Sequence, residues 1–246
     1  MKLLVCISKV PDTTSKITFT DNNTKFNEAG VQFIINPYDE WYALVRALEL
    51  KETLGGTVTV INVGKADSEQ IIRKALALGA DDAVRIDLNP ADAYQVASNI
   101  AEYAKKENFE IIFTGKETID YNGGIVGGMI AELLELPYVS LASKLNVGVA
   151  EVTIERELEG MKETVSVKMP CVVSAQKGMA EARIPNMRGI LASKSKPVNI
   201  ITPTITELNA GVKEFSLPPE KTGCKMISAD NPAELIELLH NEARVI

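Results

Sequence analysis

The stretch FTGKETIDYNGGIVGGMIAELL, residues 113–134, joins a strand-like segment to a helix-like segment through a glycine-rich turn. Its four glycines are Gly123, Gly124, Gly127 and Gly128. A helix that begins near Gly124 presents unpaired N–H groups and the positive end of its dipole, which attract an anion. Glycine lacks the Cβ that would hold a phosphate away, but it also lets a helix pack closely on a sheet. The turn is therefore either a phosphate cradle or a tight corner.

The sequence around this turn alternates between strand and helix patterns. Short, mostly apolar runs typical of buried parallel strands lie at residues 2–8, 57–64, 82–87 and 109–115. Apolar residues with helical spacing lie at 37–52, 67–80 and 92–106. This alternation predicts a doubly wound, mostly parallel sheet of the α/β class.

Two segments depart from that rhythm. Residues 9–36 are polar and rich in turn residues, which predicts a two-stranded excursion with its turn at Asn22 and Asn23. Residues 146–176 alternate apolar and polar side chains in two arms around residues 159–162. That alternation predicts a β-hairpin that runs into a buried strand.

The end of the chain has a different character. From Pro197 it is rich in Pro, Thr and Ser, and it is weakly patterned until a short amphipathic helix at 231–245. Such a tail has too few apolar residues to pack alone. We therefore divide the chain into an α/β domain at 1–196 and a C-terminal arm at 197–246, which we expect to lie along the domain or along a partner.

The composition excludes several classes of protein. A net charge of -7 argues against a nucleic-acid binder, which would normally show a basic face. No apolar run approaches the roughly 20 residues that span a bilayer, so we expect no membrane insertion.

Few residues offer chemistry. Cys6, Cys171 and Cys224 lie far apart without paired spacing, which excludes a local metal knuckle, disfavours a disulfide framework and indicates a reducing cytoplasm. The single histidine, His240, is interpreted as a solvated surface residue, and no Gly-x-Ser-x-Gly nucleophile motif occurs. We expect neither catalytic residues nor a metal.

Three expected strand ends carry small residues where open α/β sheets bind ligands. They are residues 6–8, residues 63–64 and residues 115–128, the last with Asp120 or Asn122 as a possible cap of the following helix. No Lys-Ser/Thr pair follows the glycines, so a nucleotide-hydrolysing P-loop is not expected.

The motif INPYDE precedes another helix. Asn36-Pro37 is either a helix-start signal alone, or part of a site in which Asn36 binds a base or ribose and Tyr38 presents its ring to a cofactor.

Six motifs follow one another in a distinctive order: LLVCISKVPDTT, INPYDEWYALVRALELKE, ALALGADDAVRI, GKETIDYNGGIVGGMIAELL, IERELEGMKETVSVKMPCVVSAQ and EARIPNMRGILASKSK. This order, over roughly residues 1–200, resembles the β subunits of electron transfer flavoproteins. The resemblance implies a Rossmann-like fold of the adenine nucleotide alpha-hydrolase type, with a hairpin excursion and an extended C-terminal arm. It also implies an α subunit as partner, an FAD held mainly by that partner, and AMP or a second FAD bound by this chain.

The resemblance further implies particular contact residues. Those for the nucleotide and flavin are Cys6, Asn36, Pro37, Tyr38, Asp39, Val63, Gly115, Asp120, Asn122, Gly123, Gly124, Ile125 and Val126. The segment that resembles the dehydrogenase-docking loop comprises Ala182, Arg183, Ile184, Pro185, Asn186, Met187, Arg188, Gly189, Ile190 and Leu191. Read from the local sequence alone, this segment is an ordinary surface turn.

The sequence departs from the family pattern in the phosphate turn. Many relatives carry an amide or hydroxyl side chain within residues 124–126, where this chain has Gly124, Ile125 and Val126. A phosphate here would depend on backbone N–H groups. Tyr121-Asn122 stands where an acidic pair is common, and Glu117 where Gln is common.

These observations favour an electron carrier without covalent catalysis, which accepts electrons from dehydrogenases such as acyl-CoA dehydrogenases and passes them on. Three alternatives stay open: an electron-bifurcating subunit with a second FAD, a stand-alone AMP or ATP sensor, and an adenylate-forming or pyrophosphatase-type enzyme.

Overall fold

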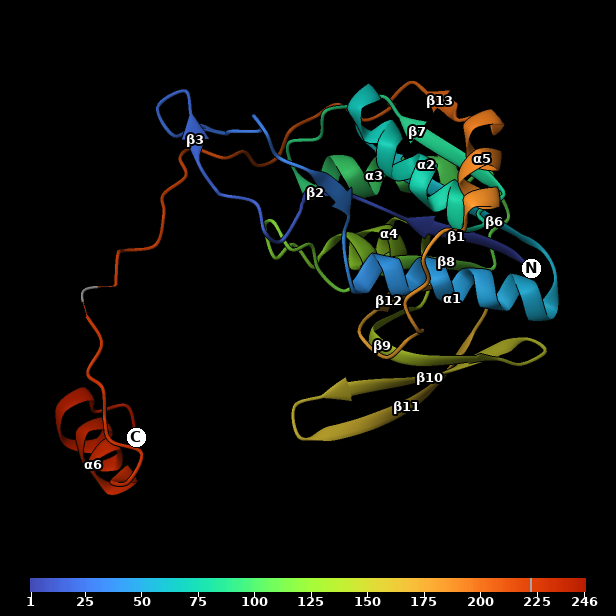
Figure 1. Ribbon diagram of the computed structural model, residues 1–246. Helices are drawn as coiled ribbons and strands as arrows, with labels where there is room; N and C mark the ends of the chain where they lie inside the picture. Colours follow the sequence, from blue (N-terminus) through green and yellow to red (C-terminus); the bar gives the residue numbers. More distant parts are fainter. Residues whose placement is uncertain (222) are drawn as a thin grey trace.

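A large sheet forms the centre of the molecule, which is described here by a computed structural model for residues 1–221 and 223–246. Its strands are β1 (Lys2–Cys6), β6 (Thr57–Val63), β7 (Asp82–Ile86), β8 (Ile111–Gly115), β9 (Tyr138–Val147), β10 (Glu151–Leu158), β11 (Met161–Lys168), β12 (Cys171–Ala175) and β13 (Asn199–Ile201). They lie in the order β11-β10-β9-β12-β8-β1-β6-β7-β13 (Figure 1). From β9 to β13 in this order every pair is parallel, whereas β10 is antiparallel to both its neighbours. The predicted mostly parallel α/β class is confirmed.

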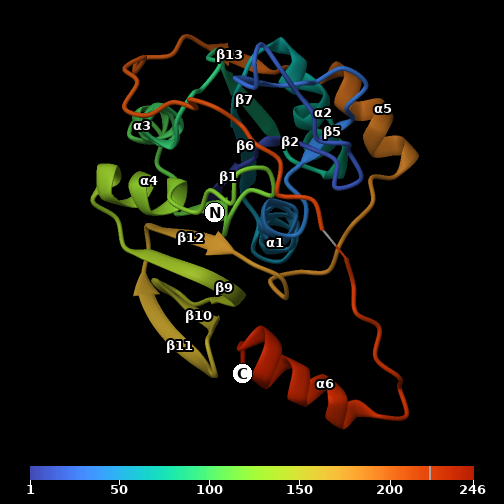
Figure 2. The same ribbon diagram turned by 90° about the vertical axis from the view of Figure 1, so that its left-hand side faces the viewer.

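Helices cover both faces of the parallel sheet (Figure 2). One face carries α1 (Asp39–Leu54) and α2 (Glu69–Leu78), and the other carries α3 (Ala93–Ala104) and α4 (Val126–Leu134). A further helix, α5 (Met187–Ser195), packs on the outside of α2. No helix of the described residues is long and apolar enough to cross a membrane.

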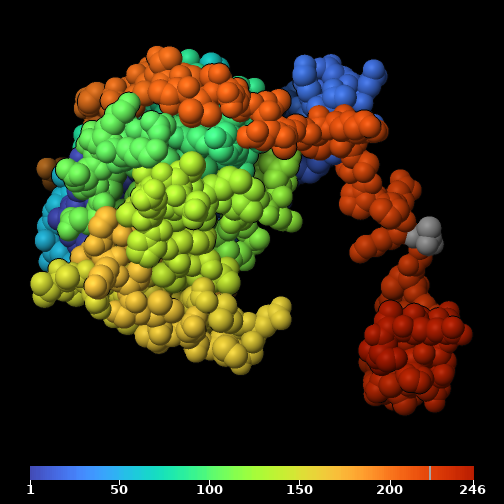
Figure 3. Space-filling view, turned by 180° about the vertical axis from the view of Figure 1, so that it is seen from behind, coloured from blue at the N-terminus to red at the C-terminus, as the bar shows by residue number. Residues whose placement is uncertain are grey.

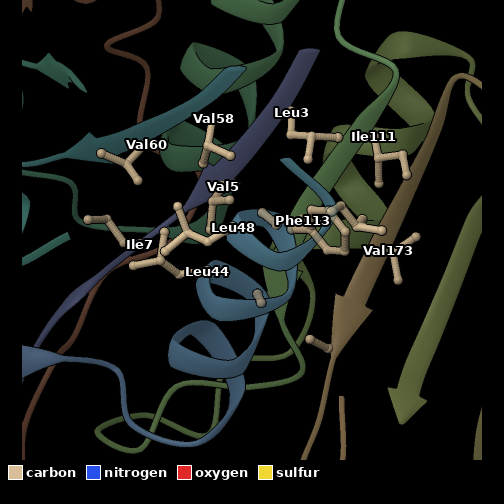
Figure 4. Packing of buried hydrophobic residues seen from close by; sticks show 14 of the residues in the cluster. Leu3, Val5, Ile7, Leu44, Leu48, Val58, Val60, Ile111, Phe113 and Val173 are labelled. Atoms are coloured by element: carbon tan, nitrogen blue, oxygen red, sulfur yellow. The ribbon is translucent and has the colours of Figure 1, made fainter. Parts of the chain in front are cut away.

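The central strand β1 is buried on both faces because its side chains alternate between two cores. Leu3 and Val5 pack with α1 and α2, whereas Leu4 and Cys6 pack with α3 and α4. Figure 4 shows the first of these cores, where Leu44 and other side chains of α1 lie against β1 and its neighbours. A strand buried on both sides needs a continuous apolar sequence, which is the pattern seen at its position.

The segment between β1 and α1 forms an excursion from the sheet, as predicted, but with two pairs of strands rather than one. Strands β2 (Lys9–Pro11) and β5 (Phe33–Ile35) pair antiparallel at its base. Beyond them β3 (Phe19–Thr20) and β4 (Lys25–Phe26) form a small hairpin that projects from the body (Figure 1). Its turn includes Asn22 and Asn23, both with positive φ, as expected from the sequence.

The predicted hairpin is β10–β11, and two further strands were not anticipated. One is β9, whose polar residues alternate irregularly because it is only partly buried and has a register shift opposite Glu155 and Arg156. The other is β13, which pairs with β7 at the far edge of the sheet. The sheet therefore continues beyond residue 196, where we expected the arm to begin.

The arm crosses the N-terminal end of α3 after β13. The Asn99 side chain accepts hydrogen bonds from Thr204 N (2.9 Å) and Ile205 N (3.2 Å), and donates to Ile205 O (2.7 Å). Gln95 Nε2 donates to Thr206 O at 2.9 Å. Both amide side chains are buried, so residues 204–206 are an integral part of the body.

Beyond this contact the arm ends in α6 (Pro232–Leu238) and a π-helical turn (Leu239–Ala243). Figures 1 and 3 show this helical end apart from the body. None of the residues of α6 is buried. The helix predicted at 231–245 is present.

Replacement of Asn99 tests how firmly the arm is attached. Asn99→Ala removes three part-buried hydrogen bonds to the backbone of residues 204–205, and we expect it to lower the free energy of unfolding by about 1–3 kcal/mol. Ser98→Ala is the matched control, because the neighbouring Ser98 Oγ is buried without a hydrogen-bond partner among the described residues. Urea denaturation should show a loss for Asn99→Ala and none for Ser98→Ala; equal stability of both variants would contradict the attachment.

Candidate functional site

The chain changes direction across the sheet beside β1. From β1 it proceeds to β6 and β7 on one side, and then returns to β8 on the other side. The segments that follow β1 and β8 therefore leave the sheet in opposite directions and open a crevice at the carboxyl ends of the strands. The three strand ends singled out in the sequence, at Cys6, Val63 and Gly115, all lie at this edge.

The segment after β8, residues 116–125, is a closed turn held by the opposite side of the crevice. Thr118 N donates to Gly123 O at 3.1 Å, and Asn122 N donates to Thr118 O at 2.9 Å. The fully buried Asn36 donates to Glu117 O (2.8 Å) and accepts from Ile119 N (3.0 Å). The turn therefore uses both polar atoms of the Asn36 side chain. In a nucleotide site, Asn36 would hold the turn in place rather than contact the ligand through its side chain.

Unpaired amides mark the start of α4. Among the hydrogen bonds of the described residues, none is donated by the backbone N–H groups of residues 123–128. The helix begins at Val126 rather than near Gly124, and its N-cap, Ile125, makes no side-chain cap. Such a helix start attracts anions through its free amides and its dipole.

The expectation that Asp120 or Asn122 caps this helix is wrong. Asp120 Oδ1 accepts instead from the amide of Tyr121 at 2.9 Å, and Asn122 has a φ of 50° within the closed turn. Because the helix starts at Val126 and its N-cap position is Ile125, both residues lie too far before the helix to cap it. The free amides of residues 123–128 are left without a protein carboxylate.

The glycines of the turn divide between the two roles considered in the sequence. A Cβ on Gly127 would lie 2.6 Å from Thr114 Oγ1 and 3.1 Å from the Tyr138 hydroxyl, so this glycine lets α4 pack on the sheet. A Cβ on Gly123 would meet only Thr118 Oγ1 at 3.5 Å, an ordinary contact. Gly127 is a packing glycine, whereas Gly123 leaves the outer surface of the turn open.

The first turn of α1 closes the crevice on its other side. Glu40 is buried and accepts hydrogen bonds from Ser8 N and Ser8 Oγ, both at 2.6 Å. A Cβ on Gly115 would lie 2.8 Å from Glu40 Cγ, so glycine is required where β8 meets α1. Burial raises the pKa of Glu40 to about 8, although the Ser8 hydrogen bonds oppose the shift. At neutral pH this carboxyl is largely uncharged, which lowers the negative charge beside an anion site.

The residue before α1 is strained. Tyr38 has φ 66° and ψ -69°, and Asp39 N donates to Pro37 O at 2.8 Å. These values define the rarer, strained form of the γ-turn, which a non-glycine residue adopts at a cost of about 1–3 kcal/mol. The turn directs the Tyr38 ring outward, where it is 58% exposed. Strain of this kind clusters at functional sites, which favours a role for the ring in contact with a ligand or partner.

The end of β6 is held by buried polar side chains. Asn62 Nδ2 donates to Ile7 O and Arg85 Nη1 donates to Gly64 O, both at 2.9 Å. Asn62 Oδ1 and Thr114 Oγ1 are buried beneath the same edge without a partner among the described residues. The bonds from Asn62 and Arg85 fix the backbone at the end of β6 where it borders the crevice.

The Cys6 side chain is buried at this edge and its thiol stays protonated. Burial, and secondarily the charge of Glu40, raises the pKa of the Cys6 thiol far above its ordinary value. A thiol that stays protonated is neither a nucleophile nor a metal ligand. Within the described part of the chain, no group of three or more His, Cys, Asp or Glu side chains could hold a metal ion.

A groove lies beside this edge, on the outer side of α1. Its volume is about 340 Å³, and its lining includes Tyr38, Trp41, Lys74 and Ala182. Lys74 Nζ lies 4.8 Å from the centre of the Trp41 ring. The groove connects the strained turn with the segment predicted to dock dehydrogenases.

That segment, residues 182–191, is an anchored apolar ridge. Arg183 makes a two-pronged ion pair with Glu52 at the end of α1 (2.7 and 2.9 Å). A Cβ on Gly189 would lie 2.2 Å from Ala77 O, so α5 can approach α2 this closely only with glycine there. Met187 is 71% exposed, and the large apolar side chains of Ile184 and Leu191 are also exposed.

Most of the predicted nucleotide residues thus lie at one edge of the sheet, whereas the predicted docking residues lie on the outer side of α1 and α2 and meet them only at the groove shared by Tyr38 and Ala182. Sequence reasoning missed the partnership of Glu40 with Ser8 and the positions of Thr114 and Arg85. Glu40 follows Asp39 at a helix start, where acidic residues are expected to interact with the helix dipole in solvent. Nothing in the local pattern indicates that Glu40 is buried.

The pH dependence of stability tests the state of Glu40. Its ordinary pKa is 4.5 and its folded value is about 8, so the folded chain binds more protons than the unfolded chain between these values. The contribution of Glu40 to stability therefore falls as pH rises from about 5 to 8. Glu40→Gln can still accept from Ser8 N through its oxygen and donate to Ser8 Oγ through its amide nitrogen. This variant should remove the fall in urea titrations from pH 5 to 9. Glu181→Gln, at an exposed position, is the control; parallel curves for the wild type and Glu40→Gln would contradict the assignment.

Known proteins share both the sequence and its length. A family model described as "Electron transfer flavoprotein domain" matches residues 23–206. The chain is 36% identical over 260 aligned residues to electron transfer flavoprotein subunit beta of Bacillus subtilis, with the whole of both chains covered. It is 35% identical to the subunit of the same name from Syntrophomonas wolfei, covering all of this chain and 98% of that one.

The similarity extends to eukaryotes. Electron transfer flavoprotein subunit beta of Homo sapiens is 30% identical over 255 residues, with 100% of this chain and 99% of the human protein covered. Because such relatives span the full length, the match includes the sheet, the hairpin and the arm. The chain therefore belongs to the family of electron transfer flavoprotein β subunits.

Proposed function

We propose that this chain is the β subunit of a heterodimeric electron transfer flavoprotein. It accepts electrons from dehydrogenases, such as acyl-CoA dehydrogenases, and passes them on through an FAD held mainly by an α subunit. The observation that carries the proposal is the run of unpaired amides at residues 123–128, at the switch point of a sheet from this family.

The residues at this edge fit the phosphate of a nucleotide. Free amides and a helix start would hold the phosphate, and the backbone at Cys6 and Val63 would border the base. Burial keeps Glu40 largely uncharged at neutral pH, which limits repulsion of the phosphate. AMP is the proposed occupant, with the AMP part of a second FAD as the alternative.

The flavin would supply the electron chemistry, and this chain would supply its surroundings. Tyr38, exposed on its strained turn, would form part of the wall of the flavin site beside the α subunit. The chain itself would carry out no covalent catalysis, which agrees with the inert Cys6 thiol. The three cysteines are free, and we place the protein in the cytoplasm.

The ridge at residues 182–191 is the proposed docking surface for a dehydrogenase. Its anchors hold Met187 in place before docking, so little conformational entropy would be lost on binding. The end of the arm, with α6 exposed, is proposed to pack on the α subunit. A stand-alone nucleotide sensor would have no use for either surface.

Co-expression with an α-type subunit tests the proposal as a whole. We expect a yellow complex that releases one FAD and one AMP on denaturation, measured by chromatography and mass spectrometry. Two FAD and no AMP would instead identify the bifurcating alternative. Absence of both a complex and a nucleotide would overturn the proposed function.

A charge at the start of α4 tests the phosphate cradle in the same complexes. Ile125 is 56% exposed at the N-cap position. Ile125→Asp should cap the helix and preserve stability, but its carboxylate would compete with a phosphate for the same amides. We expect at least a tenfold weaker affinity for AMP, and no such loss for the uncharged cap Ile125→Asn. Equal AMP retention by both variants would place the phosphate elsewhere.

Truncation of Met187 tests the docking ridge. Met187→Ala should weaken docking by about 1–2 kcal/mol, or roughly tenfold, as for a central apolar contact. The expected result is a higher KM of a dehydrogenase for the complex, with little change in kcat and unchanged flavin content. Met161→Ala is the matched control, because Met161 is 62% exposed on the distant hairpin. The same KM for both variants would contradict the assignment.

A further inference from the structure

The arm makes a second contact with the body at Phe215, beyond its attachment to α3. Phe215 N donates a hydrogen bond to Asn23 O at 2.7 Å. Its ring stacks on Phe19, with centroids 5.0 Å apart and planes 10° apart. It also lies 6.4 Å from the Tyr121 ring, at 37°. Figure 3 shows the arm passing over the region of α3 and then beside the β3–β4 hairpin before it leaves the body.

These partners belong to the two segments that flank the crevice. Phe19 lies in the excursion that follows β1, and Tyr121 lies in the turn that follows β8. The β3–β4 hairpin has no buried residue, so its own contacts fix it weakly. Phe215 thus joins two segments that the sheet sends in opposite directions.

The same contact is the point at which the arm departs. The hydrogen bonds of the described residues that link the arm to the body end at Phe215, and Lys225 pairs instead with Glu242 inside the arm. Beyond it, Leu217, Met226 and Ile236 are exposed. A subunit bound to the arm beyond Phe215 would therefore affect how firmly Phe215 is held against the body.

We propose that Phe215 is a positioning residue for the nucleotide site. Through its stack on Phe19 and its tilted contact with Tyr121 it holds the two flanking segments together, so that the free amides of residues 123–128 keep one arrangement. Seating of the arm by a partner and binding of the nucleotide then strengthen each other, since coupling between two sites is reciprocal. The inference rests on the proposed function, because it takes the ligand of the turn to be AMP or FAD.

Calorimetric titration of the full-length chain with AMP, and separately with FAD, tests the proposal. Phe215→Ala should weaken binding of the nucleotide about tenfold, in the range typical of coupled sites. Phe215→Tyr, which keeps the stacked ring, should restore wild-type affinity. Leu217→Ala is the matched control two residues further along, on the exposed part of the arm.

Addition of the α-type subunit gives the second readout. It should raise the nucleotide affinity of the wild type and of Leu217→Ala, and have a clearly smaller effect on Phe215→Ala. If Phe215 only stabilises the fold, Phe215→Ala should lower the thermal stability, but the α-type subunit should raise its nucleotide affinity as much as that of the wild type. That result would count against the proposal. If Phe215→Ala binds the nucleotide with wild-type affinity and responds fully to the α-type subunit, the positioning role of Phe215 is overturned and the proposed function still stands. Failure of the wild type to bind either nucleotide, both alone and with the α-type subunit, would overturn both.

Discussion

The parallel pairing of β1 on both of its edges is the constraint on which the rest of the structure depends. A strand with neighbours on both sides and apolar side chains on both faces has to be covered by two helix layers. It also has to send the chain away in opposite directions, because β6 continues on one side and β8 on the other. The crevice, the free amides of α4 and the buried Glu40 are all consequences of that arrangement.

Local sequence patterns were sufficient for much of this fold. Apolar runs located β1, β6, β7 and β8, and helical spacing located the helices between them, because these elements bury their side chains in regular patterns. Local patterns did not reveal β9, which is partly exposed and irregular. They also did not reveal β13, which has only three residues and is a strand through its pairing with β7. The attachment of the arm through Asn99 was also invisible, since a polar residue in a helix is ordinarily solvated.

The candidate site was predictable in position but less so in detail. Strand ends and glycines indicated the edge of the sheet at which the crevice and the free amides of residues 123–128 lie. They did not show that Gly127 serves packing against Thr114, or that Asn36 is occupied by the turn. The Asn36 bonds join residues 81 and 83 positions apart, and the Gly127 contact depends on how α4 packs on the sheet. No local pattern contains either. The strained turn at Tyr38 was likewise hidden, because the sequence Asn-Pro-Tyr-Asp also fits an ordinary helix start.

The two outer strands of the sheet have a consequence for the protein in a crowded cell. An exposed strand edge offers free N–H and C=O groups on which another chain can add a strand, the first step of aggregation. Here one edge, β13, has only three residues, and the other, β11, carries charged side chains such as Lys162, Glu163 and Lys168. Short length on one side and charge on the other are the means by which natural sheets avoid such growth. The protein can therefore leave the apolar side chains of residues 182–191 exposed without also offering its sheet as a template for self-association.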